Sequence, residues 1–373
     1  MYDMRILLLS TGGHIGGEET FTRNLGKALI ERGHDVTTAA GGSVQIEDLN
    51  AASIPIAEID ITKRRALGLL KGAISLQRYV EHTKPEIIHC QAAGPAIMGG
   101  IIRKLGWGKG EKWIYHDHGI NKWTYKWLPL FLNSLDLTIT NSDFELIRLK
   151  ANGVKDEKIV RIHNGIVPAD YSFSDEKKTN LRKKYRTEFG IPEEDFVLGY
   201  IGRLSPEKGC DLLIPACKLV SENSNPGLRL LVVGDGILRS RLQEESLSSG
   251  LDKKVIFTGF RTDIPGILTC MDALVLPSYI ETFSLTTLQA MGSGIPVIAS
   301  DTGGNPEQVI NNFNGLLFET GKIDSLARKI RLMIDRKDRD IMGHKGYLLV
   351  ENYLNASRMV DEIEYNYKKV SIK

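Results

Sequence analysis

The feature that most constrains the fold is an alternation of short β-branched runs with longer segments of helical periodicity. The first half has expected strands at Arg5–Ser10, Val36–Ala40, Ile54–Ile59, Ile87–Cys90, Trp113–Tyr115, Leu137–Thr140 and Ile159–Ile162. The second half has them at Phe196–Ile201, Arg229–Val233, Val255–Thr258, Ala273–Leu276, Val297–Ala299 and Leu316–Phe318. Helical patterns such as Thr20–Glu31 and Asp143–Asn152 lie between the strands. This order is typical of α/β proteins with parallel, doubly wound sheets.

The alternation is interrupted once and then restarts. Between Gly165 and about Asn180, Pro168 and several Asp and Ser residues break the periodicity. A chain of 373 residues is also long for one hydrophobic core. We therefore expect one α/β domain over 1–170, a second over 171–355, and a terminal helix over 356–373.

The composition is that of a globular protein, with 42% hydrophobic residues, 25% charged residues and a net charge of +2. The N-terminus leads directly into a strand and no apolar run approaches the length of a membrane span, so a cytoplasmic location is expected. No nucleic-acid partner is expected. The four cysteines form no C-x-x-C pair, which favours buried, reduced thiols over disulfides or a metal site.

The segment after the strand Ala273–Leu276 has the pattern of an anion site. The strand stops at Pro277, a short loop carries Glu281, and an amphipathic helix opens at Phe283–Leu285. A helix that begins just above strand tips directs unpaired N–H groups and the positive end of its dipole at whatever lies there. Phosphate is the natural occupant.

Three further loops follow expected strands. The first contains Gly12, Gly13, Gly16 and Gly17 and opens a helix, so a phosphate or sugar could approach closely. The glycines fall in pairs, unlike the dinucleotide fingerprint G-x-G-x-x-G.

The second is the tract Tyr115-His116-Asp117-His118-Gly119, which follows the fifth expected strand. Strand alternation places His116 and His118 on one side and Asp117 on the other, and no second His or Cys cluster completes a metal site. A hydrogen-bonded structural role is one interpretation of His118.

The third loop lies in Gly202–Gly209, where Arg203 and Lys208 flank a turn between a strand and a helix. The pair suits a clamp on a diphosphate, because Arg can bind it bidentately and Lys acts as a point charge. Surface ion pairs are the alternative. The tract lacks the P-loop pattern.

These tracts resemble retaining glycosyltransferase family 4 over essentially the whole chain. The family motif has a Glu, seven residues and a second Glu, followed by Gly-x-Pro-Val. Here Glu281 matches the first acid, 294–297 match the glycine–proline string, and Gln289 stands at the second acid. The resemblance implies a GT-B fold, with two Rossmann-like doubly wound domains facing across a cleft. It also implies that the terminal helix crosses back onto the N-terminal domain.

The resemblance assigns catalytic roles residue by residue. His118 would orient the sugar and Glu281 would contact its hydroxyls, while Arg203 and Lys208 would hold the diphosphate leaving group. The phosphate would also meet the backbone N–H groups of Phe283, Ser284 and Leu285.

Other positions are expected to contact the rest of the donor. Gly16 and Gly17 would approach the phosphates, whereas Gly234 and Arg261 would line the nucleobase pocket. Gln289 would face the ribose with one carbonyl acceptor in place of the two oxygens of a carboxylate.

The implied reaction transfers a hexose or N-acetylhexosamine, with retention, from a nucleotide diphosphate sugar (UDP-sugar first) to a glycan or lipid-linked acceptor in cell-surface polysaccharide synthesis. No metal or other cofactor is expected, because the cationic side chains and the helix N-terminus supply the positive charge. The Asp-x-Asp string Asp338-Arg339-Asp340 is not assigned to a metal, because it lies in a charged helical stretch far from any strand end. Two alternatives stay open: a sugar-nucleotide epimerase of the same architecture, and a catalytically silent GT-B partner subunit, which Gln289 suggests.

A basic, tryptophan-rich span suggests peripheral contact with an anionic membrane at its inner face. Residues 61–128 contain twelve Lys or Arg, four Asp or Glu, and all four tryptophans of the chain. Such residues are attracted to an anionic bilayer surface, with Lys63, Arg64, Arg65 and 122–127 as the expected contacts. A solvated face over ordinary core tryptophans is the alternative.

Overall fold

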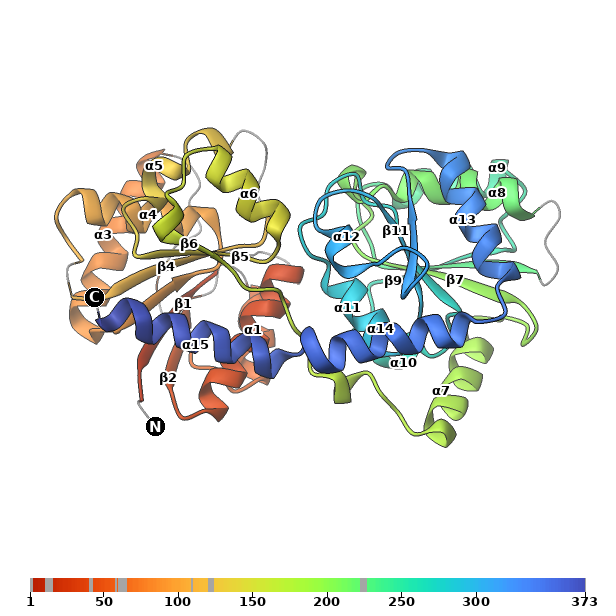
Figure 1. Cartoon of the computed structure of the whole chain (residues 1–373), viewed down its shortest axis with the longest axis horizontal. Coiled ribbons are helices and arrows are strands. Elements are labelled where there is room, and N and C mark those ends of the chain that lie inside the picture. The colour runs from red at the N-terminus through yellow and green to blue at the C-terminus, as the bar shows by residue number, and fades with distance from the viewer. Residues whose placement is uncertain are drawn as a thin grey trace. The chain divides into compact units, whose positions relative to one another are not determined.

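The computed structural model describes residues 3–10, 16–39, 43–57, 59, 66–108, 110–119, 124–221 and 227–372. The chain forms two compact units, and each contains one six-stranded sheet with all strands parallel (Figure 1). Unit 1 comprises Met1–His163 and Met359–Lys373, and unit 2 comprises Asn164–Arg358. The sequence placed the break after residue 170, whereas the structural boundary follows His163. No helix among the described residues is long and apolar enough to cross a bilayer.

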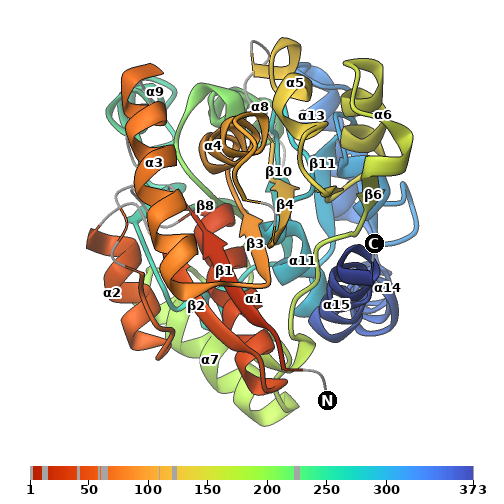
Figure 2. The same ribbon diagram turned by 90° about the vertical axis from the view of Figure 1, so that its left-hand side faces the viewer.

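Unit 1 has the strand order β2-β1-β3-β4-β5-β6. The strands are β1 (Arg5–Leu9), β2 (Asp35–Ala39), β3 (Ile87–Cys90), β4 (Lys112–Asp117), β5 (Leu137–Thr140) and β6 (Ile159–Arg161). The helices are α1 (Gly17–Glu31), α2 (Ser43–Ala51), α3 (Ala66–Thr83), α4 (Ala93–Lys104), α5 (Pro129–Leu132), α6 (Asp143–Ala151) and most of α15 (Ala356–Ile372). In Figure 2 this unit faces the viewer, and α3 and α4 lie beside its strands.

The expected strand over Ile54–Ile59 is wrong. In its described residues, 54–57 and 59, only an isolated bridge joins Ile56 to Thr38. Pro55 has no N–H to donate to a ladder, and the buried Ile54 side chain packs towards α1. The apolar run therefore covers the core without extending the sheet.

The C-terminal helix α15 docks on unit 1 through a buried stripe. Met359, Val360, Ile363 and Tyr367 are all at most 2% exposed. The Tyr367 hydroxyl lies 2.6 Å from Nδ1 of His89 on β3, and the His34 Nε2 lies 3.1 Å from the Glu364 carboxylate. The helix predicted to end the chain therefore packs against the N-terminal sheet.

Unit 2 has the order β12-β11-β10-β7-β8-β9. The strands are β7 (Phe196–Ile201), β8 (Leu228–Val233), β9 (Val255–Gly259), β10 (Ala273–Leu276), β11 (Val297–Ser300) and β12 (Gly315–Phe318). The helices are α7 (Asp175–Glu188), α8 (Leu213–Ser221), α9 (Arg239–Ser248), α10 (Ile264–Leu268), α11 (Leu285–Gly292), α12 (Asn305–Gln308), α13 (Ile323–Asp335) and α14 (Arg339–Tyr353).

Strand alternation divides the core of unit 2 between the two faces of the sheet. Leu198 and Leu230 belong to the cluster under α8 and α13, whereas their neighbours Val197 and Leu231 belong to the cluster under α7, α10, α11 and α14. Both faces are covered, which explains why the strands read as continuous apolar runs. The sheet is a doubly wound Rossmann type, whose order reverses between β7 and β10.

A buried ion network fixes the start of β7 and β10. The Arg186 side chain on α7 is almost fully buried and donates to the Asp272 carboxylate over 2.9 Å. The same carboxylate oxygen accepts the Val197 N–H, and the Asp272 N–H donates to the Val197 carbonyl. The two strands at which the sheet order reverses are therefore tied together at their amino ends.

Candidate active site

The loops after β7 and β10 meet at the carboxyl edge of the unit 2 sheet, where a doubly wound sheet binds its ligands. Lys208 follows β7 and Glu281 follows β10. The Lys208 ammonium donates to Oε2 of Glu281 over 2.8 Å, and the Ser278 hydroxyl lies 3.3 Å from the same oxygen. The structure thus brings together two of the predicted catalytic residues.

Two glycines allow the loops around Lys208 and Glu281 to pack closely. Gly209 has φ +63°, and a Cβ there would lie 2.0 Å from the Pro277 carbonyl oxygen. Gly303 has φ +56°, and its Cβ would lie 1.8 Å from the Glu281 carbonyl oxygen. A side chain at position 209 would push the Lys208 loop away from the loop after β10, and one at position 303 would push the loop after β11 away from the Glu281 backbone.

The α11 N-terminus follows the same loop. Ser284 caps the helix, because its hydroxyl accepts the Thr287 N–H over 3.2 Å. The Ser284 N–H, predicted to bind phosphate, donates instead to Oε1 of Gln308 over 2.8 Å. Leu285 and Thr286 precede Thr287 in the first turn of the helix, where N–H groups have no backbone acceptor within the helix. Because the Thr287 N–H is already bound by Ser284, the N–H groups of Leu285 and Thr286 are the ones suited to an anion.

Gln289 lies on α11, and its amide nitrogen donates to the Tyr171 hydroxyl over 3.0 Å. This bond leaves the Gln289 carbonyl oxygen as the atom suited to accept from a ribose. The ribose contact itself stays a prediction.

The remaining predicted donor residues lie on the loops after β7, β8 and β9. Arg203 is exposed in the loop after β7. The Gly234 N–H donates to the Gly259 carbonyl, and this hydrogen bond joins the start of the loop after β8 to the end of β9. The Arg261 guanidinium pairs with Glu188 and Asp263, and Tyr185 also donates to Asp263. Arg261 therefore ties its loop to α7, and its contact with a nucleobase stays a prediction.

In unit 1, the predicted residues lie after β1 and β4. Gly16 is the N-cap of α1 and Gly17 is its first residue. Gly12 and Gly13 lie outside the described residues. His118 follows β4, and its Nε2 lies 2.9 Å from Oε1 of Gln91, which follows the neighbouring strand β3.

Three histidines stack side by side in unit 1. The His116 and His118 rings are 4.7 Å apart at 16°, as the alternation predicted, and His89 stacks on His116 at 5.5 Å and 13°. Burial lowers the pKa of both His89 and His118 to about 3, and it lowers the pKa of His116 well below its usual value. The stack is therefore neutral at physiological pH.

Sequence reasoning missed His89, Gln91, Gln308 and Tyr171. His89 lies on β3 and Gln91 directly follows it, and β3 is the neighbour of β4. The sequence signal that could have found them was a pair of polar residues at the end of a buried strand. Gln308 and Tyr171 lie far along the chain from α11. Nothing in the local pattern connected them with it.

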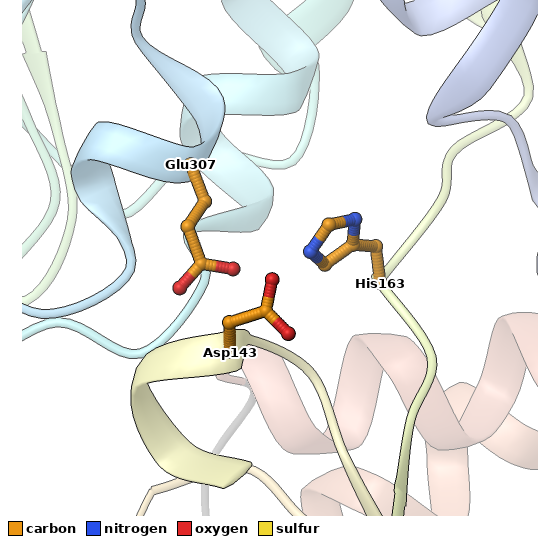
Figure 3. Close-up of side chains that lie close together, drawn as sticks. All are labelled: Asp143, His163 and Glu307. Atoms are coloured by element: carbon orange, nitrogen blue, oxygen red, sulfur yellow. The ribbon is translucent and has the colours of Figure 1, made fainter. Parts of the chain in front are cut away.

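Figure 3 labels Asp143, His163 and Glu307, each of which could offer one ligand atom to a metal ion. Asp143 begins α6 and pairs with Arg161, and His163 follows β6, both in unit 1. Glu307 belongs to α12 of unit 2. Within its described residues, unit 1 offers only two of these three ligands, so we assign no metal centre. The expected metal independence stays a prediction.

Comparison with known proteins identifies the family. The model for glycosyltransferase family 4 matches residues 15–170, and the model for glycosyl transferases group 1 matches 182–349. The chain is 31% identical to the UDP-Gal:alpha-D-GlcNAc-diphosphoundecaprenol alpha-1,3-galactosyltransferase of Escherichia coli over 79% of this chain and 78% of that protein. The chain belongs to glycosyltransferase family 4.

Other similarities agree with this membership. The N-acetyl-alpha-D-glucosaminyl L-malate synthase of Bacillus anthracis is 24% identical over 95% of this chain and 94% of its own length. The solved structure of Anabaena HepE in complex with UDP-glucose has a TM-score of 0.86 at 23% identity, covering 98% of this chain and 100% of that one. The fold is GT-B and the protein is a glycosyltransferase, which confirms the predicted architecture and enzyme class.

We expect Lys208→Ala to lower kcat by a factor of about 100 to 1000, because it removes the positive charge predicted to face the departing phosphate and leaves Glu281 without its cation. Arg203→Ala should have an effect in the same direction. Steady-state assays of nucleotide release measure both variants.

The matched control for this prediction is Lys253→Ala, which removes an exposed lysine of the same unit. It should keep the parental kcat. A Lys208→Ala enzyme as fast as the parent would show that the leaving group does not meet Lys208.

Proposed function

We propose that this enzyme transfers a hexose or N-acetylhexosamine from a UDP-sugar, with retention of anomeric configuration, to a lipid-linked glycan in cell-surface polysaccharide synthesis. The observation that carries the proposal is the Lys208–Glu281 pair beside the N-terminus of α11. It sets a cation for the diphosphate next to a carboxylate for sugar hydroxyls. The E. coli relative is named for a UDP-sugar donor and a diphosphoundecaprenol acceptor, which supports both substrate classes.

Retention is proposed to proceed by front-face attack. The leaving phosphate oxygen takes the proton of the acceptor hydroxyl while Lys208, Arg203 and the first turn of α11 stabilise the negative charge that develops. A double displacement would need a carboxylate nucleophile beside the anomeric carbon. Glu281 is held by Lys208 and Ser278 and is assigned to the hydroxyls instead.

A donor screen tests the proposal directly. The protein is incubated with UDP-, GDP- and ADP-sugars and a lipid-diphosphate acceptor, and released nucleotide is measured by mass spectrometry. We expect UDP release that requires the acceptor and continues in EDTA, because protein groups supply the positive charge.

Each alternative gives a different result in the same screen. Conversion of a UDP-sugar without acceptor would indicate an epimerase, and no turnover of any donor would indicate a silent subunit. Strict dependence on Mg²⁺ or Mn²⁺ would contradict the metal-free mechanism.

Gln289→Glu tests the ribose contact. Tyr171 can donate to a carboxylate as well as accept from an amide, so the variant should fold normally. We expect nucleotide Kd to change by about tenfold or less, equivalent to ~1.4 kcal/mol. Calorimetric titration with UDP measures it, with Tyr171→Phe as the comparison that removes the supporting hydroxyl. Unchanged binding of every nucleotide by Gln289→Glu would mean that position 289 does not touch the donor.

The acceptor proposal includes reversible contact with an anionic membrane. Among the described residues of the basic span, Trp113 is buried, but Trp107 is 42% exposed and Trp127 68%, and Leu130 just beyond the span is 54% exposed. Lys104 at the end of α4 lies 5.0 Å from the ring centroid of Phe131 on α5, so a cation and apolar groups share this surface. Lys63, Arg64, Arg65, Lys122 and Trp123 lie outside the described residues.

Vesicle co-sedimentation tests this contact. Each exposed Lys or Arg near an anionic bilayer contributes about 1 kcal/mol, so binding should require anionic lipid and weaken with salt. Trp127→Ala should weaken binding, whereas Tyr353→Ala, which removes a similarly exposed aromatic residue of unit 2, should not. Failure to bind anionic vesicles at low salt would favour a soluble acceptor, such as the malate in the name of the B. anthracis relative.

A further inference from the structure

The His118 ring is held on three sides. It stacks on His116, lies 4.6 Å from the Phe21 ring of α1 at 58°, and places Nε2 within 2.9 Å of Oε1 of Gln91. These contacts give the two ring nitrogens distinct surroundings. Nδ1 has no hydrogen-bond partner within the part of the chain that the structure describes.

The backbone of Gln91 is fixed by the sheet. It follows β3 directly, its backbone N–H donates to the Leu9 carbonyl at the end of β1, and its side chain is 1% exposed. The strands β1 and β3 are the pair between which the crossovers of unit 1 change direction. Gln91 therefore presents an amide oxygen from the point in this sheet where a ligand is expected.

The backbone on the other side of His118 is fixed as well. Oδ1 of Asp117 accepts the Gly119 N–H over 3.1 Å and the Tyr115 hydroxyl over 2.8 Å. Both bonds hold the turn that follows β4. His118 therefore extends from a turn that these two hydrogen bonds hold in place.

We propose that Gln91 is a positioning residue that selects the Nε2–H tautomer of His118 and so presents Nδ1 as a hydrogen-bond acceptor for a neutral donor group of the substrate. A carbonyl oxygen can only accept, so with Oε1 facing the ring the 2.9 Å contact is a hydrogen bond when Nε2 carries the proton. A neutral ring with its proton there has a lone pair on Nδ1.

This assignment has a consequence for specificity, and it rests on the proposed function, in which His118 meets the sugar. A sugar hydroxyl or an N-acetyl N–H can donate to Nδ1. The carboxylate of a uronic acid cannot, and two acceptors would face each other. Gln91 and His118 together therefore select uncharged sugars over uronic acids.

The test is NMR of the full chain with ¹⁵N-labelled histidine, with the His118 signals assigned by a His118→Gln variant. We expect Nε2 to resonate as a protonated, pyrrole-type nitrogen and Nδ1 as an unprotonated, imine-type nitrogen. A protonated Nδ1 in the parent protein would overturn the proposal, because the amide of Gln91 would then be donating to Nε2.

Two variants test the role of Gln91 itself. Gln91→Leu should give a mixture of tautomers and lower kcat by about tenfold, the effect of losing one buried neutral hydrogen bond. Gln91→Glu should raise the pH at which His118 titrates, since a carboxylate stabilises the imidazolium, and the acid limb of the rate profile should move up with it. Turnover of a UDP-uronic acid relative to the matching hexose should rise in Gln91→Glu, because the imidazolium offers an Nδ1–H.

The control is Gln77→Leu, which removes another buried glutamine of unit 1, on α3, and should leave the His118 signals unchanged. A Gln91→Leu protein that folds, by circular dichroism, and keeps the parental tautomer would overturn the proposal. If the tautomer is as expected but no donor is turned over, the assignment of Gln91 stands and the proposed transfer is what fails.

Discussion

The reversal of strand order in each sheet is the constraint on which the rest of the molecule depends. Crossovers between parallel strands are right-handed, so the loops at the carboxyl edge separate only where the crossovers change direction. In unit 2 this point lies between β7 and β10, and the loops that follow these strands carry Lys208 and Glu281. In unit 1 it lies between β1 and β3, and Gln91 follows β3.

The site in unit 2 combines charges with a helix terminus. Lys208 and Glu281 are partly buried, so their mutual contact stabilises both charged groups in the absence of a substrate. A bound diphosphate would share the lysine, while the carboxylate would turn to sugar hydroxyls. The first turn of α11 adds fixed dipoles that need no reorganisation during the reaction.

The predicted phosphate contacts changed in one respect. Gln308 accepts the Ser284 N–H with its oxygen and donates to the Ser284 carbonyl with its amide nitrogen, so it holds the residue before α11 from both sides. This bidentate bond fixes the entry angle of the helix. It assigns a positioning role to Ser284, and we expect an anion at the N–H groups of the two residues that follow, Leu285 and Thr286.

The sequence by itself determined the strand–helix alternation, the two sheets, the loops that carry Lys208, Glu281 and His118, and the family. These properties are local, because a buried parallel strand, a glycine turn and a helix N-terminus each have a pattern within a few residues. The Ile54–Ile59 run shows the limit, since an apolar segment covers a core as well as it extends a sheet. Only the tertiary structure decided that Gln91 holds His118, that Gln308 takes the Ser284 N–H and that Tyr171 bonds Gln289. Each of these pairs joins residues far apart in the chain, and their meeting depends on strand order and loop path, which no local pattern encodes.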